Sequence, residues 1–216
     1  MKRIRPKRLV GIAFLLLAIW ITADLFIPKH ANLRQFDPVF VGKMDSDMWR
    51  AYYEKKPVKL FFQLARLMRK QYHAPYWRSF FIAYRAAKAA FVFKEGRTRA
   101  DYAKALPPLE KFYREINRLS DRPFDVKRVA QLELEWWIIR REPDQFTPAD
   151  WERILAEEAG VMYHEPAEKF LNYARLRTEA MVFRDEKREN TREADWDKIE
   201  RLLVDCWRAL NFELRD

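Results

Sequence analysis

The sequence has few of the residues that mark common catalytic and metal sites. Only one of its 216 residues is a cysteine, Cys206, so an intrachain disulfide is excluded and packing must hold the fold together. The four glycines are scattered and form no phosphate-binding loop. The histidines His30, His73 and His164 lie in unrelated segments, with no pair three or four residues apart. We therefore expect neither a metal site nor a cofactor.

Signatures of nucleophilic catalysis are also missing. Ser46, Ser79 and Ser120 lack the glycine-flanked context of a nucleophile elbow. A glycosidase needs two carboxylates across a cleft, but spacing alone nominates no pair among 32 acidic residues. The sequence predicts a protein that is not an enzyme and has no catalytic residues. An enzyme of unknown chemistry remains the third alternative.

The low glycine content and abundant helix-forming residues favour an all-α fold. No alternating strand pattern of useful length is present, whereas alanine, leucine, glutamate, lysine and arginine are frequent. Several segments repeat apolar residues at spacings of three and four, as an amphipathic helix does. About 190 residues follow the apolar N-terminal stretch, which suits one domain with its own core.

The stretch from Leu9 to Ile27 predicts a transmembrane anchor. Its nineteen residues would span roughly 28 Å as a helix, close to the thickness of a hydrocarbon core. Asp24 shortens the uncharged run. A signal peptide cleaved after Ala23 is one alternative, and a core or interfacial helix is another.

Basic residues flanking this stretch predict its orientation. Five precede it and three follow within about 20 residues, and the positive-inside rule places the richer side in the cytoplasm. We therefore expect residues 1–8 to be a cytoplasmic flank and the body to be extracytoplasmic, at a cell membrane (periplasmic in a double-membrane bacterium). The basic residues counted are Lys2, Arg3, Arg5, Lys7 and Arg8 before the stretch, and Lys29, Arg34 and Lys43 after it.

The remaining chain is expected to form a tether over residues 28–45 and a helical domain over residues 46–216. The tether should have no helical period but should lie against the body, because it is too apolar for a free linker. About seven antiparallel helices in a bundle are predicted, with an irregular α-solenoid as the second choice. Pro57 should bend or divide the first of them, and Pro107 and Pro108 the third. The expected helices cover about residues 46–72, 75–94, 98–119, 125–142, 147–163, 166–187 and 190–212.

Charge is distributed unevenly along the predicted body. Residues 50–104 hold fourteen basic and three acidic residues, a net charge of +11, whereas residues 105–216 hold twenty basic and twenty-five acidic residues, a net charge of −5. The two halves could pack on each other, or the basic half could face anionic lipid headgroups or an acidic protein. Nucleic acid is not an expected partner, because an extracytoplasmic body would rarely meet it.

Two charged residues interrupt the apolar faces of predicted helices. Glu133 lies among Val129, Ala130, Trp136 and their neighbours, and Arg177 has a similar position on a later helix. A buried charge is costly unless it is paired. We therefore predict a structural ion pair for each of these residues, with each other as one candidate pairing. The functional alternative is a polar pocket in which Glu133 acts as an acid or base.

These observations predict a single-pass membrane protein that works by binding, as an accessory or scaffolding subunit of a larger membrane protein complex. The alternative is a membrane-anchored module that binds anionic lipid or an envelope polymer through the basic region 50–104. The aromatic candidates could equally belong to the core. The candidate binding residues are Trp49, Tyr52, Tyr53, Arg66, Arg69, Lys70, Tyr76 and Trp77.

Overall fold

All regular elements in the described part of the chain are helices. The structure is a computed structural model that describes residues 6–215. This confirms the all-α prediction. Residues 1–5, which belong to the predicted cytoplasmic flank, lie outside the described residues.

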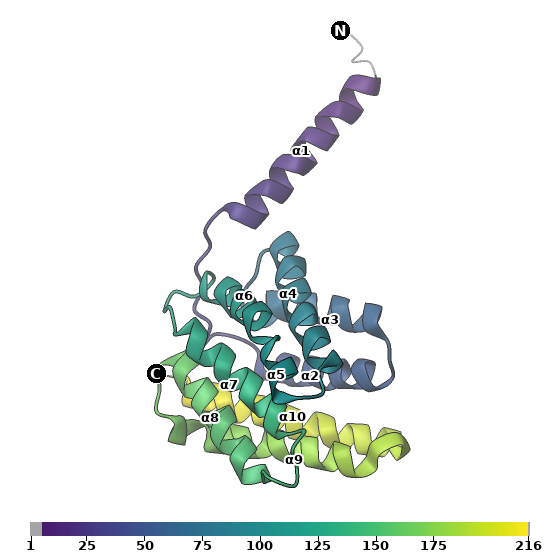
Figure 1. The fold of residues 1–216 in the computed structure, drawn as a ribbon. Helices are drawn as coiled ribbons and strands as arrows, with labels where there is room; N and C mark the ends of the chain where they lie inside the picture. The colour runs from purple at the N-terminus through teal and green to yellow at the C-terminus, as the bar shows by residue number, and fades with distance from the viewer. Residues whose placement is uncertain (1–5, 216) are drawn as a thin grey trace.

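The first helix, α1 (Pro6–Phe26), projects away from the rest of the molecule (Figure 1). Its segment Leu9–Phe26 has a mean hydropathy of 2.3, and none of that segment is buried. This helix is long and apolar enough to cross a membrane. A signal sequence can have the same length and composition.

Nine α-helices and two short 3₁₀ turns form the body between residues 38 and 213. Seven were expected. The difference arises because Pro57 divides the first predicted helix and the prolines at 107 and 108 divide the third, as proline at a helix start requires. The elements are α2 (Pro38–Tyr53), α3 (Pro57–Gln71), α4 (Tyr76–Glu95), α5 (Arg99–Ala103), α6 (Leu106–Asn117), α7 (Val126–Ile139), α8 (Pro148–Tyr163), η1 (Ala167–Phe170), α9 (Leu171–Lys187), η2 (Arg188–Asn190) and α10 (Glu193–Glu213).

The expectation that residues 28–45 have no helical period is wrong for the second half of that segment. Helix α2 begins at Pro38 rather than near Ser46. Asp37 caps it, because its Oδ1 accepts hydrogen bonds from the backbone N–H groups of Val39 (2.9 Å) and Phe40 (3.1 Å). An acidic residue followed by proline is a typical helix start, so the sequence carried the signal.

The first half of the segment has no helix and lies against the body, as expected. Ala31 donates its backbone N–H to the carbonyl of Leu119 (2.7 Å) and accepts a bond from the N–H of Asp121 (3.1 Å). Arg34 Nη2 donates to the carbonyl of Tyr163 (2.6 Å). These bonds attach the segment to the loop after α6 and to the end of α8.

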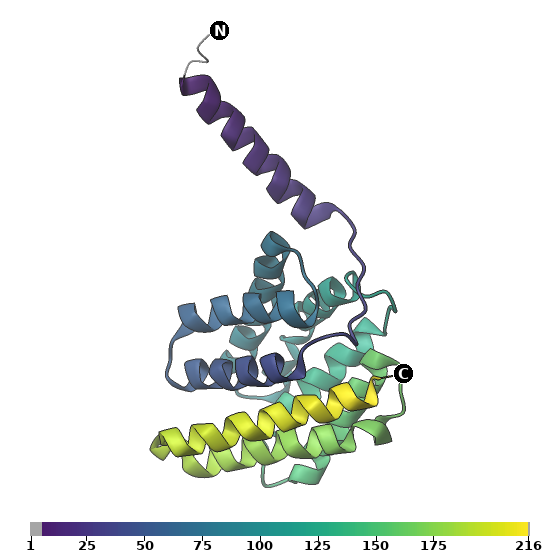
Figure 2. The same ribbon diagram turned by 180° about the vertical axis from the view of Figure 1, so that it is seen from behind.

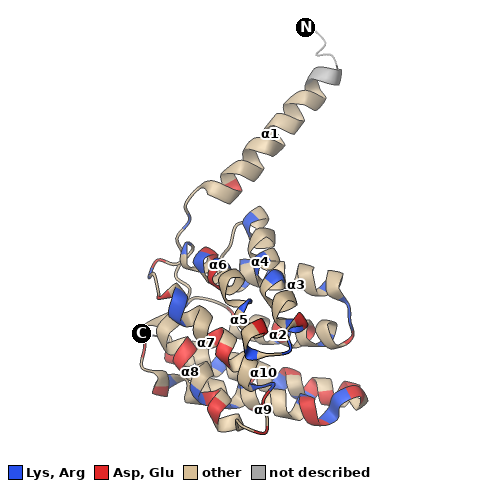
Figure 3. Ribbon diagram, viewed as in Figure 1, with Lys and Arg blue, Asp and Glu red and all other residues tan. Residues whose placement is uncertain are grey.

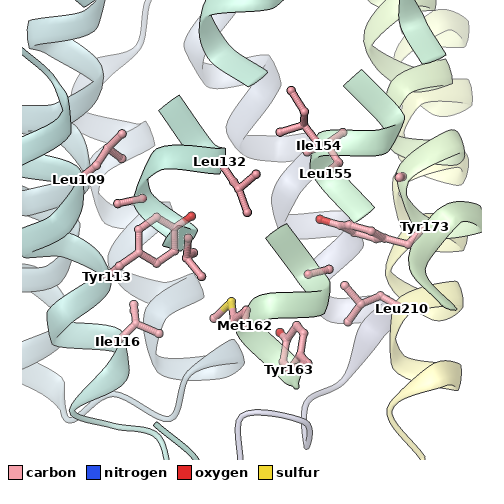
Figure 4. Close-up of a cluster of buried hydrophobic side chains, with 14 of the residues drawn as sticks. Leu109, Tyr113, Ile116, Leu132, Ile154, Leu155, Met162, Tyr163, Tyr173 and Leu210 are labelled. Carbon is pink, nitrogen blue, oxygen red and sulfur yellow. The ribbon is translucent and has the colours of Figure 1, made fainter. Parts of the chain in front are cut away.

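The body helices form a closed circuit of contacts. Helices α2, α3, α4, α6, α7, α8, α9 and α10 each pack on the next, and α10 returns to pack along α2. Figure 2 shows α10 (yellow) beside α2 (dark blue). An open solenoid would keep its first and last helices apart. The main core lies inside the circuit, where side chains of α6, α7, α8, α9 and α10 meet (Figure 4).

Helices α2 and α10 approach each other closely at Gly42. A Cβ atom added to Gly42 would lie 2.5 Å from Val204 Cα and 2.8 Å from Val204 N, which are backbone atoms that cannot turn aside. Only a residue without a side chain fits there. Gly42 therefore sets the distance at which the last helix closes on the first body helix.

Candidate functional site at the base of α1

The end of α1 is joined to the body by a helix cap. Asp24 Oδ2 accepts hydrogen bonds from the backbone N–H groups of Trp77 (2.6 Å) and Arg78 (3.1 Å), in the first turn of α4. Pro75 precedes this turn and makes no side-chain cap of its own. A carboxylate at this position stabilises exposed N–H groups and the positive end of the helix dipole. The one acidic residue of the apolar stretch is therefore the N-cap of a helix about fifty residues later.

Aromatic rings reinforce this junction. The Trp20 ring stacks on Tyr76 at 6.0 Å between centroids and meets Trp77 edge-on at 5.6 Å. Tyr76 in turn contacts Phe80 at 5.3 Å. These four residues, the aromatic junction, hold the last turns of α1 against the start of α4, the helix nearest its lower end in Figure 1.

Large apolar side chains continue outward from the aromatic junction along α3 and α4. Phe80 contacts Phe62 at 5.9 Å, which brings the two helices together. Tyr84 lies four residues after Phe80, and Phe91 seven residues further, so all three fall on one stripe of α4. We call the following exposed set the α3–α4 apolar face: Val58, Phe62, Tyr84 and Phe91, which are 69%, 57%, 51% and 65% exposed.

The five aromatic candidates from the sequence divide between surface and core. Tyr76 is 45% exposed, and the half-buried Trp77 contacts it in the aromatic junction. Tyr52 is exposed at the end of α2, away from the junction. Trp49 and Tyr53 are half-buried and pack against buried clusters, and the guanidinium of Arg184 lies 3.7 Å from the centre of the Tyr53 ring. The structure therefore brings Tyr76 and Trp77 together at the junction, and separately Tyr52 and Tyr53, whose rings meet edge-on at 5.3 Å at the end of α2.

The three basic candidates of α3 also differ in environment. Arg66 and Lys70 are exposed and lie over the Phe40 ring at 5.1 and 5.9 Å. Arg69 donates a hydrogen bond from Nη1 to the hydroxyl of Ser79 (2.7 Å). Its guanidinium also lies 5.2 Å from the Tyr76 ring. Arg69 thus supports the aromatic junction, while Arg66 and Lys70 face solvent.

Several basic residues of the 50–104 region do pack on the acidic half. Arg50 pairs with Glu193, and Arg99 Nη2 lies 2.6 Å from Glu142 Oε2. Figure 3 shows acidic residues on α7 to α10, away from the end of the body that α1 joins. Packing between the two halves thus explains part of the charge asymmetry.

The predicted internal charge Glu133 lies in a network of polar groups between α6, α7 and α8. Its Oε2 accepts a hydrogen bond from Trp136 Nε1 (3.0 Å) and lies 3.2 Å from the Tyr113 hydroxyl. The same hydroxyl lies 2.7 Å from Glu158 Oε1. Tyr113 is one of the labelled residues in Figure 4.

Glu158 was not among the charges predicted to be internal. Burial raises the pKa of Glu158 well above its ordinary value of 4.5, and the charge of Glu133, which also hydrogen-bonds to it, adds to the rise. The signal was its spacing, because Glu158 lies four residues after Ile154 and four before Met162, both of which are buried. A carboxyl group with a raised pKa occurs in active sites and in structural networks alike.

The other predicted charge, Arg177, has a partner that the sequence did not suggest. Its Nη1 lies 2.5 Å from Asp45 Oδ2, and Trp207 Nε1 donates to the same oxygen at 2.9 Å. Thus Arg177 of α9 joins Asp45 of α2 and Trp207 of α10, while Glu133 is bonded elsewhere. Asp45 was missed because it fell in the segment expected to be a tether. Its position one residue after the buried Met44 and four after Val41 was the available signal.

Comparisons with known proteins give no match. No family model matches the chain, and neither the curated proteins nor the solved structures contain a significant match. The function therefore has to be inferred from the geometry of the anchor, the apolar face and the polar networks.

Proposed function

We propose that the protein is a single-pass membrane protein whose helical bundle works by binding, as a non-enzymatic accessory or scaffolding subunit of a larger membrane protein complex. The observation that carries the proposal is the α3–α4 apolar face, which continues from the aromatic junction beside α1. Exposed apolar patches on a folded body mark surfaces that partners cover. Aromatic residues are frequent among those that contribute most to such interfaces.

The contacts of α1 support retention of this helix as an anchor. Cleavage after Ala23 would remove Trp20 and its ring contacts with Tyr76 and Trp77. Residues 9–20 are all exposed, which suits a helix whose surroundings are lipid. With the more basic flank in the cytoplasm, the body is extracytoplasmic.

The position of the apolar face restricts its partner. A patch held next to a membrane span meets proteins of the same membrane at high effective concentration, because both are confined to two dimensions. The partner is therefore a membrane protein whose extracytoplasmic part presents apolar side chains close to the bilayer. Anchoring and docking together describe an accessory subunit.

The test is extraction from native membranes in mild detergent, followed by native electrophoresis and mass spectrometry of comigrating proteins. We expect the wild type to run in a large complex and the double variant Phe62→Ser/Phe91→Ser to run alone. Tyr52→Ser is the matched control, because it removes an exposed aromatic residue outside the face, and it should remain in the complex. A wild type that runs alone, near its 26.3 kDa plus detergent, would overturn the proposal.

A second candidate function is binding of anionic lipid or an envelope polymer through the basic region 50–104. It is favoured by the exposed side chains Arg66, Lys70 and Lys88, which among residues 6–215 have no carboxylate partner within 4 Å. Each cation near an anionic surface contributes about 1 kcal/mol. Binding to anionic vesicles that weakens with salt, without any comigrating protein, would favour this function.

A further inference from the structure

A pocket of about 370 Å³ opens where α1, α4 and α6 meet. Its walls differ in character. Apolar side chains come from the end of α1 and from α4, and charged side chains come from α4 and α6. The lining residues are Leu25, Phe26, Phe81, Arg85, Lys111, Arg114, Glu115 and Arg118.

The charged wall has an excess of positive charge that the protein leaves unbalanced. Its one acid, Glu115, binds Arg118 at 2.7 Å and faces Arg78 behind it at 3.7 Å. Within the described residues, Arg85, Lys111 and Arg114 have no carboxylate within 4 Å. The wall therefore holds four cations, Arg85, Lys111, Arg114 and Arg118, and one carboxylate.

The buried Arg78 adds to this excess. It is only 6% exposed, and its Nε and Nη1 atoms have no hydrogen-bond partner among the described residues. Its contact with Glu115 is long at 3.7 Å, whereas the same carboxylate accepts a hydrogen bond from Arg118 at 2.7 Å. A buried charge without full compensation favours an anion nearby.

The arrangement of the cations suits one compact anion. Lys111, Arg114 and Arg118 are spaced by three and four residues, so they share one face of α6. Arg85 reaches the same pocket from α4, with its guanidinium 4.6 Å from the centre of the Phe81 ring. One arginine side chain can donate two parallel hydrogen bonds to phosphate oxygens, and a lysine side chain adds a point charge.

The apolar wall of the pocket requires a ligand that also has an apolar part. Leu25 and Phe26 end the apolar stretch of α1, and Phe26 is 76% exposed. In a spanning α1 they lie where the helix leaves the hydrocarbon, at the depth of the headgroup phosphates. A free phosphate ion would leave this wall exposed to water, whereas a lipid would cover it with an acyl chain.

We propose that this pocket binds the headgroup of an anionic phospholipid, with the phosphate at Arg85, Lys111 and Arg114 and an acyl chain against Leu25, Phe26 and Phe81. The inference rests on the proposal that α1 spans the membrane, but it does not depend on a protein partner. The bound lipid would fix the body against the bilayer, since it contacts α1, α4 and α6 together.

The test is native mass spectrometry of the full-length protein in detergent, titrated separately with phosphatidylglycerol and phosphatidylcholine. We expect one phosphatidylglycerol to stay bound at concentrations at which phosphatidylcholine does not. The variant Lys111→Gln/Arg114→Gln should lose at least tenfold in affinity. Lys198→Gln/Arg201→Gln removes the same charge from exposed positions of α10 and should bind as the wild type does. Equal losses in the two variants, or equal binding of the two lipids, would overturn the site.

Two further measurements distinguish a lipid site from a site for free phosphate and test the role of the apolar wall. Inorganic phosphate that displaces the lipid at micromolar concentration would show that the pocket is a phosphate site without lipid, contrary to the proposal. The variant Phe81→Ser should weaken lipid binding while leaving the charges in place, and unchanged binding would contradict a role for the apolar wall. Since Lys111 and Arg114 are both exposed, we expect the variant Lys111→Gln/Arg114→Gln to keep the wild-type unfolding midpoint. Carbonate extraction of native membranes tests anchoring independently of lipid affinity.

Discussion

At the scale of single residues, the buried pair of Asp45 and Arg177 gives the most direct prediction. The variant Asp45→Asn leaves the Arg177 guanidinium without its counter-charge, which costs about 3–5 kcal/mol for a buried pair. We expect this loss in urea unfolding of the full chain in detergent, followed by tryptophan fluorescence. The control Arg175→Met, on the same helix but in an exposed pair with Glu179, should change stability by less than about 1 kcal/mol. Equal losses of unfolding free energy in the two variants would show that the buried pair stabilises the fold no more than the exposed pair does.

The carboxyl group of Glu158 predicts a pH dependence of stability. Because its pKa is raised in the folded protein, the folded state holds the proton more tightly than the unfolded chain. The unfolding free energy of the wild type therefore falls as pH rises above about 4.5, by about 1.4 kcal/mol per pH unit while only the folded form is protonated. Glu158→Gln cannot ionise, so its stability relative to the wild type should increase from pH 5 to pH 8.

Urea unfolding at several pH values measures this difference. The control Glu168→Gln alters an exposed glutamate. Its unfolding free energy should depend on pH in the same way as that of the wild type. A Glu158→Gln curve that also stays parallel to that of the wild type would mean that the carboxyl group titrates normally. If Glu158→Gln abolished binding or activity while stability rose, a functional role for the Glu133–Glu158 pair would be supported instead.

Glu133 and Arg177 show which features of single residues a sequence can predict. Glu133 and Arg177 were identified because each interrupts an apolar helical face, a local pattern that periodicity detects. Their partners were not identified, because Asp45 is 132 residues from Arg177 and only the tertiary fold brings them together. A pattern along one helix predicts that a buried charge needs a partner, but not which helix provides it.

At the scale of helices, Asp24 joins α1 to α4. The variant Asp24→Ala removes the cap and should cost about 1 kcal/mol of helix stability, within the 0.5–2 kcal/mol range for such caps. Hydrogen exchange by mass spectrometry should show faster exchange of the Trp77 and Arg78 amides. The control Asp37→Ala removes the cap of α2 and should affect the Val39 and Phe40 amides instead. Unchanged protection at the start of α4 would contradict the cap.

The close approach of α2 and α10 at Gly42 gives a second prediction for helices. Gly42→Ala gains up to about 1 kcal/mol of helix propensity, but its Cβ would press on the backbone of Val204. Displacing a packed backbone costs about 1–3 kcal/mol, so we expect a net loss of stability in thermal unfolding. Gly11→Ala is the control, since nothing lies within 4 Å of its added Cβ, and it should be neutral. A stabilised Gly42→Ala would contradict the close packing.

Helix boundaries were predictable where the sequence carries capping residues. The start at Thr147 and Pro148 agrees with α8, and Pro57 divides α2 from α3 as expected. The start of α2 was missed because the apolar residues before Ser46 were interpreted as a docked tether. The cap of α4 could not be predicted at all, because its acceptor comes from α1 and not from the residues before the helix.

At the scale of the whole molecule, composition predicted the helical class and the apolar first helix, but not the closure of the body. Where α10 returns to α2, the contacts are the close approach of Gly42 to Val204 and the hydrogen bond from Trp207 to Asp45, which join segments far apart in sequence. Nothing in the local periodicity of either helix indicates this partner. The charge asymmetry was also visible in the sequence, but only the fold separates the cations that pair internally, such as Arg50 and Arg99, from those that line the pocket.

Membrane topology is the prediction on which the proposed function depends most. Cys206 is buried, and burial raises the pKa of its thiol, so it should react very slowly with maleimides in the folded protein. A cysteine introduced by Glu168→Cys, at an exposed position of the body, therefore becomes the only reactive thiol. In intact cells, or in spheroplasts of a double-membrane bacterium, a membrane-impermeant maleimide should label Glu168→Cys without permeabilisation and leave the wild type unlabelled. Labelling only after permeabilisation would place the body in the cytoplasm, where the predicted orientation and an extracytoplasmic partner would both be wrong.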